Sequence, residues 1–233
     1  MGSKHTLAEN PFAVLHATPR DTDARLIDRA VEQKLLFGID TQEAQNTLLQ
    51  PGGRLRAEVG YLPCTDEENA EKVLAWLEQA GAGTGNNGGA ASGRPSGKPF
   101  EGLPDAAPEF ETGSRLAVMN SVCAFLQTWP VNSAEEAAAM CLSAARVLSG
   151  LSGQQVMEEL NEDREAGGRD LLDNPTEVAH RLAEHRRELF ALLAKKCDIL
   201  LDGEHLELLD RLSRAFVSQD GPKQSLHALE EMV

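Results

Sequence analysis

A glutamate and two histidines between residues 177 and 185 come closest to the residue types and spacing of a metal or acid–base site. Glu177 and His180 are three residues apart, which places a carboxylate and an imidazole on one helical face, as in di-iron bundles. Such a site needs a second Glu-x-x-His pair and two more inward carboxylates, which the sequence lacks. His185 follows His180 by five residues and falls on another face, unlike the four-residue step of zinc proteases. The pattern favours a solvated, salt-bridged helix face, and we predict no metal ligands.

Cys197 and the run Asn161-Glu162-Asp163-Arg164-Glu165 are the other candidates for catalysis. Two lysines precede Cys197 and favour its thiolate, but the negative end of a helix dipole opposes an anion there. The acidic run is expected to face water on a helix, with no apolar pocket to raise a carboxyl pKa. We therefore predict no catalytic residue. An enzyme that uses the pair Glu177/His180 or Cys197 stays open as an alternative.

Two glycine-rich stretches imitate phosphate-binding loops. Gly81-Ala82-Gly83-Thr84-Gly85 has no strand before it and no helix after it. Gly93-Arg94-Pro95-Ser96-Gly97-Lys98 is one residue short of the P-loop spacing and is followed by Pro99. Without a strand–loop–helix frame, the backbone amides do not converge on a phosphate. We predict that the chain binds no nucleotide or other cofactor.

The charge of the chain limits its classes of partner. The formal net charge is −15, which opposes approach to the phosphates of nucleic acid or to an anionic membrane leaflet. No apolar run approaches the length of a membrane span, and residues 1–10 contain no signal-peptide core. We expect a cytoplasmic protein that binds neither nucleic acid nor membrane. The four scattered cysteines indicate reduced, mostly buried thiols.

Helix signals, without any alternating strand pattern, run along the chain. Aromatic residues make up only 4% of the sequence, whereas Leu, Ala, Glu and Arg are common, which favours helices packed by aliphatic side chains. We predict an all-α fold of two modules, residues 5–80 and 114–233, the second being a helical bundle. Residues 81–113, rich in Gly, Pro, Ser, Ala and Asn, are predicted to form a flexible linker between them.

Serine caps mark the helix starts of the second module. Ser114, Ser133 and Ser152 each precede a helical stretch, and Glu or Gln follows the last two at the spacing of a capping box. The Ala-rich helix 137–148 is expected to be central, because small side chains allow close approach. The longest helix should run from Asn174 to Gly203. Its leucines suit either an antiparallel helix around residues 206–216 or a dimer zipper, so the oligomeric state stays open.

The first module begins with short helices. Asn10-Pro11-Phe12-Ala13-Val14-Leu15 opens one helix, with Asn as cap and Pro at the first helical position. Thr22 starts a longer helix that ends at Gly38. A third helix starts near Thr41, breaks at Pro51-Gly52-Gly53 and then resumes. The next helix is expected to pack back on these three through one apolar face of Ala70, Val73, Leu74 and Leu77.

These residues resemble a J-domain, the module of the DnaJ family of co-chaperones. Asn10-Pro11-Phe12 with Val14-Leu15 matches the family's opening, the helix with Ile27 and Ala30 matches its second helix, and Ala44-x3-Leu48-x2-Pro51-x2-Arg54 matches its closing pattern. Where the family has its His-Pro-Asp signature, the chain reads Phe37-Gly38-Ile39-Asp40. The second helix, a basic surface in the family, here mixes both charges. The resemblance implies a J-like module that lacks the part that acts on the chaperone ATPase.

We therefore expect a non-enzymatic, J-like adaptor or co-chaperone-like protein whose two modules each hold a protein partner. A heat-shock chaperone is one candidate partner, and the chain is not expected to stimulate its ATPase. The alternatives are a structural subunit of a multiprotein assembly and the enzyme described above.

Overall fold

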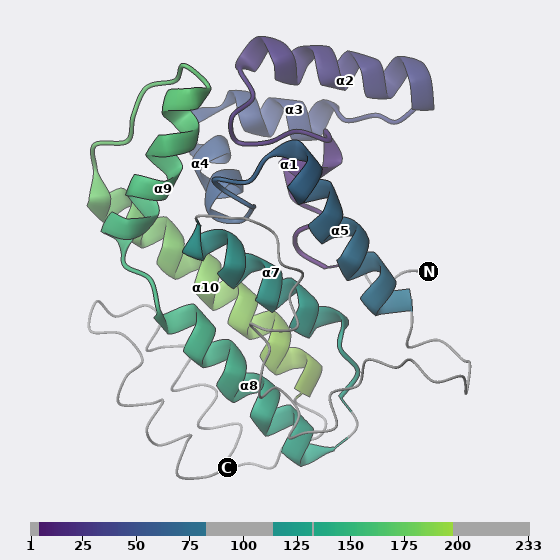
Figure 1. Cartoon of the computed structure of the whole chain (residues 1–233), viewed down its shortest axis with the longest axis vertical. Coiled ribbons are helices and arrows are strands. Elements are labelled where there is room, and N and C mark those ends of the chain that lie inside the picture. Colours follow the sequence, from purple (N-terminus) through teal and green to yellow (C-terminus); the bar gives the residue numbers. More distant parts are fainter. Residues whose placement is uncertain (1–4, 83–113, 132, 198–233) are drawn as a thin grey trace.

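The computed structural model describes residues 5–82, 114–131 and 133–197, and every regular element in these ranges is an α-helix (Figure 1). The all-α class is therefore confirmed for the described part of the chain. No helix of these ranges is both long and apolar enough to span a membrane. Most of the predicted linker, and the predicted helix around residues 206–216, lie outside the described residues. The helices are α1 Pro11–Val14, α2 Asp23–Phe37, α3 Gln42–Leu49, α4 Pro51–Val59, α5 Glu67–Ala82, α7 Arg115–Thr128, α8 Ala134–Ser149, α9 Gly153–Ala166 and α10 Pro175–Cys197.

Side-chain caps begin the helices where the sequence predicts them. Each capping side chain accepts a hydrogen bond from a backbone N–H in the first turn of its helix, which satisfies a donor that the helix itself leaves unpaired. The Ser152 N–H also donates to the Gln155 side chain, which completes the predicted capping box. The capping residues are Asn10, Thr22, Ser114, Ser133 and Ser152.

The junction of α3 and α4 differs from the prediction. Gln50 has extended backbone angles (φ −94°, ψ 129°) and separates the two helices. Pro51, Gly52 and Gly53 then form the first turn of α4 instead of a break, because proline is tolerated at the first helical position. The turn is tight at Gly53, where an added Cβ would lie 2.5 Å from the carbonyl oxygen of Thr47.

The longest described helix, α10, lies at the centre of the packing (Figure 1). It packs against α4, α7, α8 and α9. The Ala-rich α8 packs mainly on α7 and α10, so the central position does not belong to residues 137–148 as predicted. A helix of 23 residues is about 35 Å long and reaches neighbours that a shorter one cannot. Its buried face consists of Val178, Leu182, Leu189, Phe190 and Leu193.

The helices of residues 5–82 pack against those of residues 114–197. α4 contacts α9 and α10, and α5 packs chiefly on α7, while Glu67 in its first turn pairs with Arg29 of α2. The rings of Trp76 on α5 and Phe125 on α7 stack with their centroids 4.9 Å apart. Buried residues from both ranges form one continuous core. The division of the chain into two folding modules stays a prediction. In the structure, the helices of residues 5–82 share an extensive interface with those of residues 114–197.

Asn120 of α7 is a polar hub inside that interface. Its side-chain amide donates to the carbonyl oxygens of Val59 at 2.9 Å and Tyr61 at 2.7 Å, just where α4 ends. Its Oδ1 lies 2.8 Å from Nε2 of His185 on α10. The two carbonyl partners fix which side of the amide is Nδ2, and since an amide oxygen can only accept, the His185 Nε2 carries the proton. One buried amide therefore joins α4, α7 and α10.

Arg54 of α4 is fully buried and forms a second polar hub. Its Nε donates to Glu58 at 2.9 Å, and its Nη2 donates to the carbonyl oxygens of Pro19 and Asp21 at 2.9 and 3.0 Å. The other carboxylate oxygen of Glu58 accepts from Arg164 of α9 at 2.8 and 3.0 Å. A buried charge is tolerated only when its partners are supplied, and here they come from α4, α9 and the segment before α2.

Arg54→Ala should lower the free energy of unfolding by about 3–5 kcal/mol, since it removes a partner of buried Glu58 and leaves two carbonyl oxygens unpaired. The matched control is Arg56→Ala, two residues along α4. Arg56 is 67% exposed and pairs with Glu188, so its loss should cost less than about 1 kcal/mol. Urea unfolding of both variants measures the difference. Equal losses would show that Arg54 does not hold these elements together.

Candidate protein-interaction surface

The structure does not bring together Glu177, His180 and His185, the residues considered above as metal ligands. His180 is exposed on α10, with its Nε2 3.3 Å from a carboxylate oxygen of Glu184, and Glu177 is exposed one turn earlier. His185 points inward to Asn120. Within the described ranges, no group of three or more His, Cys, Asp or Glu side chains is arranged to hold a metal ion.

Asp163 and Arg164 correct the prediction that the run 161–165 faces water. Asp163 is only 1% exposed and accepts hydrogen bonds from Arg20 Nε and from the Cys64 N–H, both at 2.7 Å. Burial raises the pKa of the Asp163 carboxyl, against the opposing effect of Arg20. Arg164 pairs with buried Glu58. Both side chains therefore join α9 to residues 5–82, a structural role that the local sequence does not reveal.

Cys64 and Cys123 have thiols that are not activated for catalysis. Burial raises the pKa of Cys123 and of Cys64 to about 12, and nearby carboxylates add to the effect at Cys64. Cys197 is the last residue of α10, and its side chain lies outside what the structure describes. Lys196, which could favour a Cys197 thiolate, donates instead to the carbonyl oxygens of Leu126, Gln127 and Trp129 where α7 ends.

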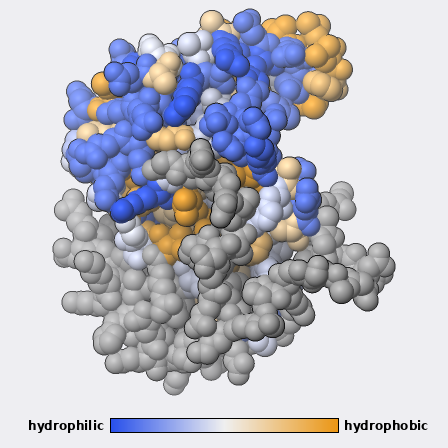
Figure 2. Space-filling view, in the orientation of Figure 1, coloured by the Kyte–Doolittle hydropathy of each residue, from blue (hydrophilic) through white to orange (hydrophobic). Residues whose placement is uncertain are grey.

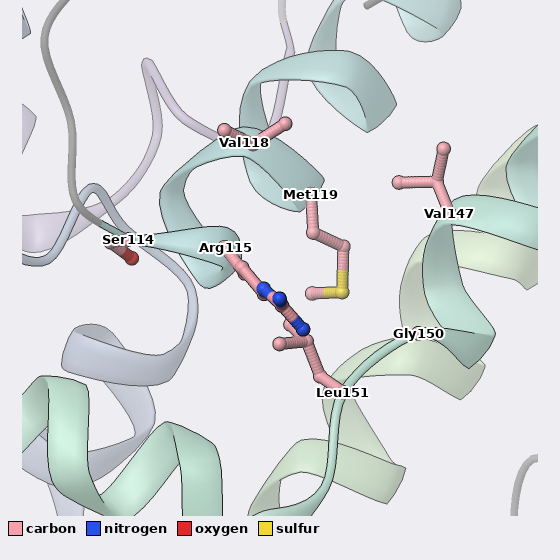
Figure 3. Close-up of a pocket in the computed structure, with 7 residues that line it drawn as sticks. All are labelled: Ser114, Arg115, Val118, Met119, Val147, Gly150 and Leu151. Atoms are coloured by element: carbon pink, nitrogen blue, oxygen red, sulfur yellow. The ribbon is translucent and has the colours of Figure 1, made fainter.

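A small apolar cavity of about 310 Å³ lies between α7 and the turn that leads from α8 to α9 (Figure 3). Arg115 is the one charged side chain among its lining residues, and the Ser114 hydroxyl donates to the Glu159 carboxylate at 2.7 Å. The lining includes no His, Cys, Asp or Glu side chain that could act as a general base. The lining residues are Ser114, Arg115, Val118, Met119, Val147, Gly150 and Leu151.

The apolar residues of α2 divide into two faces. Leu26 and Ala30 are buried, whereas Ile27, Val31 and Leu35 are 42%, 51% and 77% exposed. The exposed three follow each other at steps of four residues and form a stripe along the outer side of the helix. The buried face of α2 packs on α3. The outer stripe is not needed for this packing and is not part of the described core.

The stripe continues around the end of the α2–α3 hairpin, where Leu36, Phe37 and Ile39 are 65%, 66% and 48% exposed. Gly38 makes this possible: at φ +68° it turns the chain sharply, its N–H donates to the carbonyl oxygen of Lys34, and the Ile39 N–H donates to that of Gln33. Figure 2 shows hydrophobic side chains gathered over this end of the molecule, beside a largely hydrophilic surface. We call Ile27, Val31, Leu35, Leu36, Phe37 and Ile39 the α2 apolar surface.

Ion pairs hold α2 by its opposite side. Arg29 donates to Glu67 of α5 at 2.6 Å, and Arg25 lies 2.9 Å from Asp21. The Arg29 guanidinium holds the pKa of Glu67 below its usual value. These contacts fix the orientation of the helix and leave its apolar stripe facing outward.

Comparison with protein-family models, with curated proteins and with solved structures finds no match. The resemblance to a J-domain therefore stays a prediction that rests on its sequence motifs. The α2 apolar surface, in contrast, is a feature of the structure. The sequence offered one signal for it, because α2 has more apolar positions than a single buried face can use.

The pH dependence of stability should report the environment of His185. Burial, together with the charges of Arg186 and Arg56, lowers the pKa of His185 to about 4. Between the unfolded value near 6.5 and 4, the unfolded chain binds a proton that the folded chain does not. The free energy of unfolding should therefore fall as the pH falls through this window, by up to about 1.4 kcal/mol per pH unit from this group. Above about pH 6.5 the group contributes no pH dependence.

His185→Gln keeps a donor for Asn120 and removes the titration, so urea unfolding should show a shallower decline from pH 6.5 to 4 than in the wild type. His180→Gln, which changes an exposed imidazole, serves as the control and should follow the wild type. Parallel curves for the wild type and His185→Gln would contradict the assignment.

Proposed function

We propose that this chain is a non-enzymatic, cytoplasmic adaptor of J-like type that holds a protein partner on the α2 apolar surface. The observation that carries the proposal is the exposure of six large apolar side chains on one helix and its adjoining turn. Contiguous exposed apolar patches on soluble proteins commonly mark interaction sites, whereas single exposed apolar residues are ordinary.

The chemistry of this surface fits a macromolecule better than a small molecule. The residues lie along a helix and around the end of a hairpin, and none of them lines the cavity beside α7. Small-molecule sites are concave and bury most of their ligand. Full burial of one large apolar side chain contributes about 1.5–3 kcal/mol, so a partner that covers several of them gains substantial affinity before the costs of association.

The place of the surface agrees with the proposed ancestry. Phe37-Gly38-Ile39-Asp40 stands where the J-domain family has its His-Pro-Asp signature, and in the structure this segment ends the α2–α3 hairpin. Replacement of that signature by apolar residues removes the part that acts on the chaperone ATPase in the family. It also adds an apolar surface that can bind a partner. We therefore propose binding without stimulation of an ATPase. A structural subunit of a larger assembly would bury the same surface permanently and is the second candidate.

A photo-crosslinking amino acid at position 35 of the full chain, expressed in its own cells, should yield a discrete cross-linked product with another protein. The matched control is position 171, where Leu171 is 55% exposed away from the α2 apolar surface. The product should disappear when Phe37→Ser and Ile39→Ser are added, while the melting temperature stays unchanged because both side chains are exposed. Equal cross-linking at 35 and 171, or none at 35, would refute the proposal. A stoichiometric complex that never dissociates on dilution would favour the structural subunit.

The chain should not accelerate ATP hydrolysis by the host's heat-shock chaperone. Gly38 and Ile39 supply neither the imidazole nor the rigid turn of the missing signature, and acidic residues on α2 weaken steering toward an acidic partner. Single-turnover hydrolysis with the full chain, beside a competent J-domain, measures the effect. Stimulation comparable to that of the competent domain would overturn this part of the proposal.

A further inference from the structure

The charges around the α2 apolar surface are predominantly acidic. Asp28 and Glu32 flank the stripe on one side, and Asp40 and Glu43 lie beside the hairpin end; all four are exposed. Asp28, Glu32 and Glu43 form no salt bridge with any described residue. Lys34 is the one exposed base beside them on the outer part of α2.

The two arginines of α2 do not offset these carboxylates, because internal partners already neutralise them. Arg29 is held by Glu67 at 2.6 Å and lies 3.7 Å from Asp21, and its side chain is only 14% exposed. Arg25 pairs with Asp21 at 2.9 Å and lies 3.5 Å from Glu67. A helix that has mixed charge in sequence therefore presents an outward face that is apolar in the middle and acidic at its rim.

We infer that the occupant of the α2 apolar surface is an amphipathic helix whose apolar stripe is flanked by Lys or Arg. This inference rests on the proposed function and specifies its partner. Ile27, Val31 and Leu35 extend over about 12 Å of helix, a length that matches two turns of a partner helix with apolar residues at i, i+4 and i+8. Leu36, Phe37 and Ile39 then enclose one end of that helix, and basic flanks face Asp28 and Glu32.

The acidic charge around the α2 apolar surface disfavours other classes of binding partner. A second copy of this chain would bring the same acidic rim against itself, and the formal charge of −15 on each chain opposes that approach. Nucleic acid and anionic lipid would place phosphates beside the same carboxylates. A basic helix is the partner whose apolar and charged parts both match the surface.

The test uses three synthetic peptides and the full chain. The first peptide is a basic amphipathic helix of leucine and lysine, the second replaces each lysine by glutamate, and the third has the basic composition in an order without an apolar stripe. Fluorescence anisotropy at low and at physiological salt measures binding. The basic amphipathic peptide should bind at least about tenfold more tightly than either of the others at low salt, and this ratio should shrink as salt screens the rim charges.

Two double variants separate the apolar and charged contributions. Leu35→Ser/Phe37→Ser should abolish binding of the basic peptide. Asp28→Lys/Glu32→Lys should weaken it about tenfold and improve binding of the acidic peptide. The control Glu165→Lys/Asp173→Lys changes the net charge equally at two exposed sites on α9 and the loop after it, and should leave the peptide preference intact. Circular dichroism melting of each variant confirms that it folds.

The outcomes distinguish this inference from the proposed function. If position 35 cross-links to a partner in cells but the basic and acidic peptides bind equally, the surface is a docking site and the inferred partner chemistry is wrong. Equal loss of preference in the control variant would show that only the net charge matters, which also overturns the inference. Concentration-dependent dimerisation that is lost in Leu35→Ser/Phe37→Ser would replace the basic helix by a second copy. Absence of both peptide binding and cross-linking would overturn both proposals.

Discussion

Burial of the Arg54 guanidinium is the constraint on which the arrangement of the first helices depends. A charged group with no exposed surface cannot rely on water, so its donors must meet protein acceptors. The side chain of Glu58 and the carbonyl oxygens of Pro19 and Asp21 accept from its Nε and Nη2, and the Asp23 carboxylate lies 3.7 Å from its Nη1. The segment that enters α2 is thereby tied to α4. Because Glu58 also accepts from Arg164, the same charge pair draws α9 onto this side of the molecule.

The position of Asp21 transmits this constraint to the outer surface. While its carbonyl oxygen accepts from Arg54, its carboxylate accepts from the Thr18 N–H at 2.8 Å and pairs with Arg25. Together with Glu67, it pairs with Arg25 and Arg29 on the side of α2 opposite the apolar stripe. The outer side has an apolar stripe and carboxylates, such as Asp28 and Glu32, that form no salt bridge with a described residue. Asp21 therefore links the buried Arg54 of α4 to the α2 apolar surface and its acidic rim.

Local signals in the sequence were sufficient to predict the helices but not the side-chain contacts between them. Ser152 and Gln155 are three residues apart, so their capping box depends on a single turn of chain and is readable without the fold. Asp163 and His185 depend on Cys64 and Asn120, which lie 99 and 65 residues away. No local pattern separates a solvated carboxylate from one buried at an interface. For the same reason, the spacing of the apolar residues of α2 predicted a helix but not which of its faces is buried. Contacts with α3 and with Glu67 determine that face.

Gly38 shows how a small change in backbone chemistry can alter what a helical hairpin does. The left-handed turn at φ +68° reverses the chain within a few residues and places Ile39 beside the last turn of α2. A proline at that position would hold φ near −65° and present a different end to the hairpin. Under the proposed ancestry, a rigid polar loop that acts on a partner has become a compact apolar end that can only bind one. Contacts of this kind contribute affinity, but they place no group that a reacting nucleotide would need. The chemistry of the hairpin end therefore fits the adaptor function proposed above.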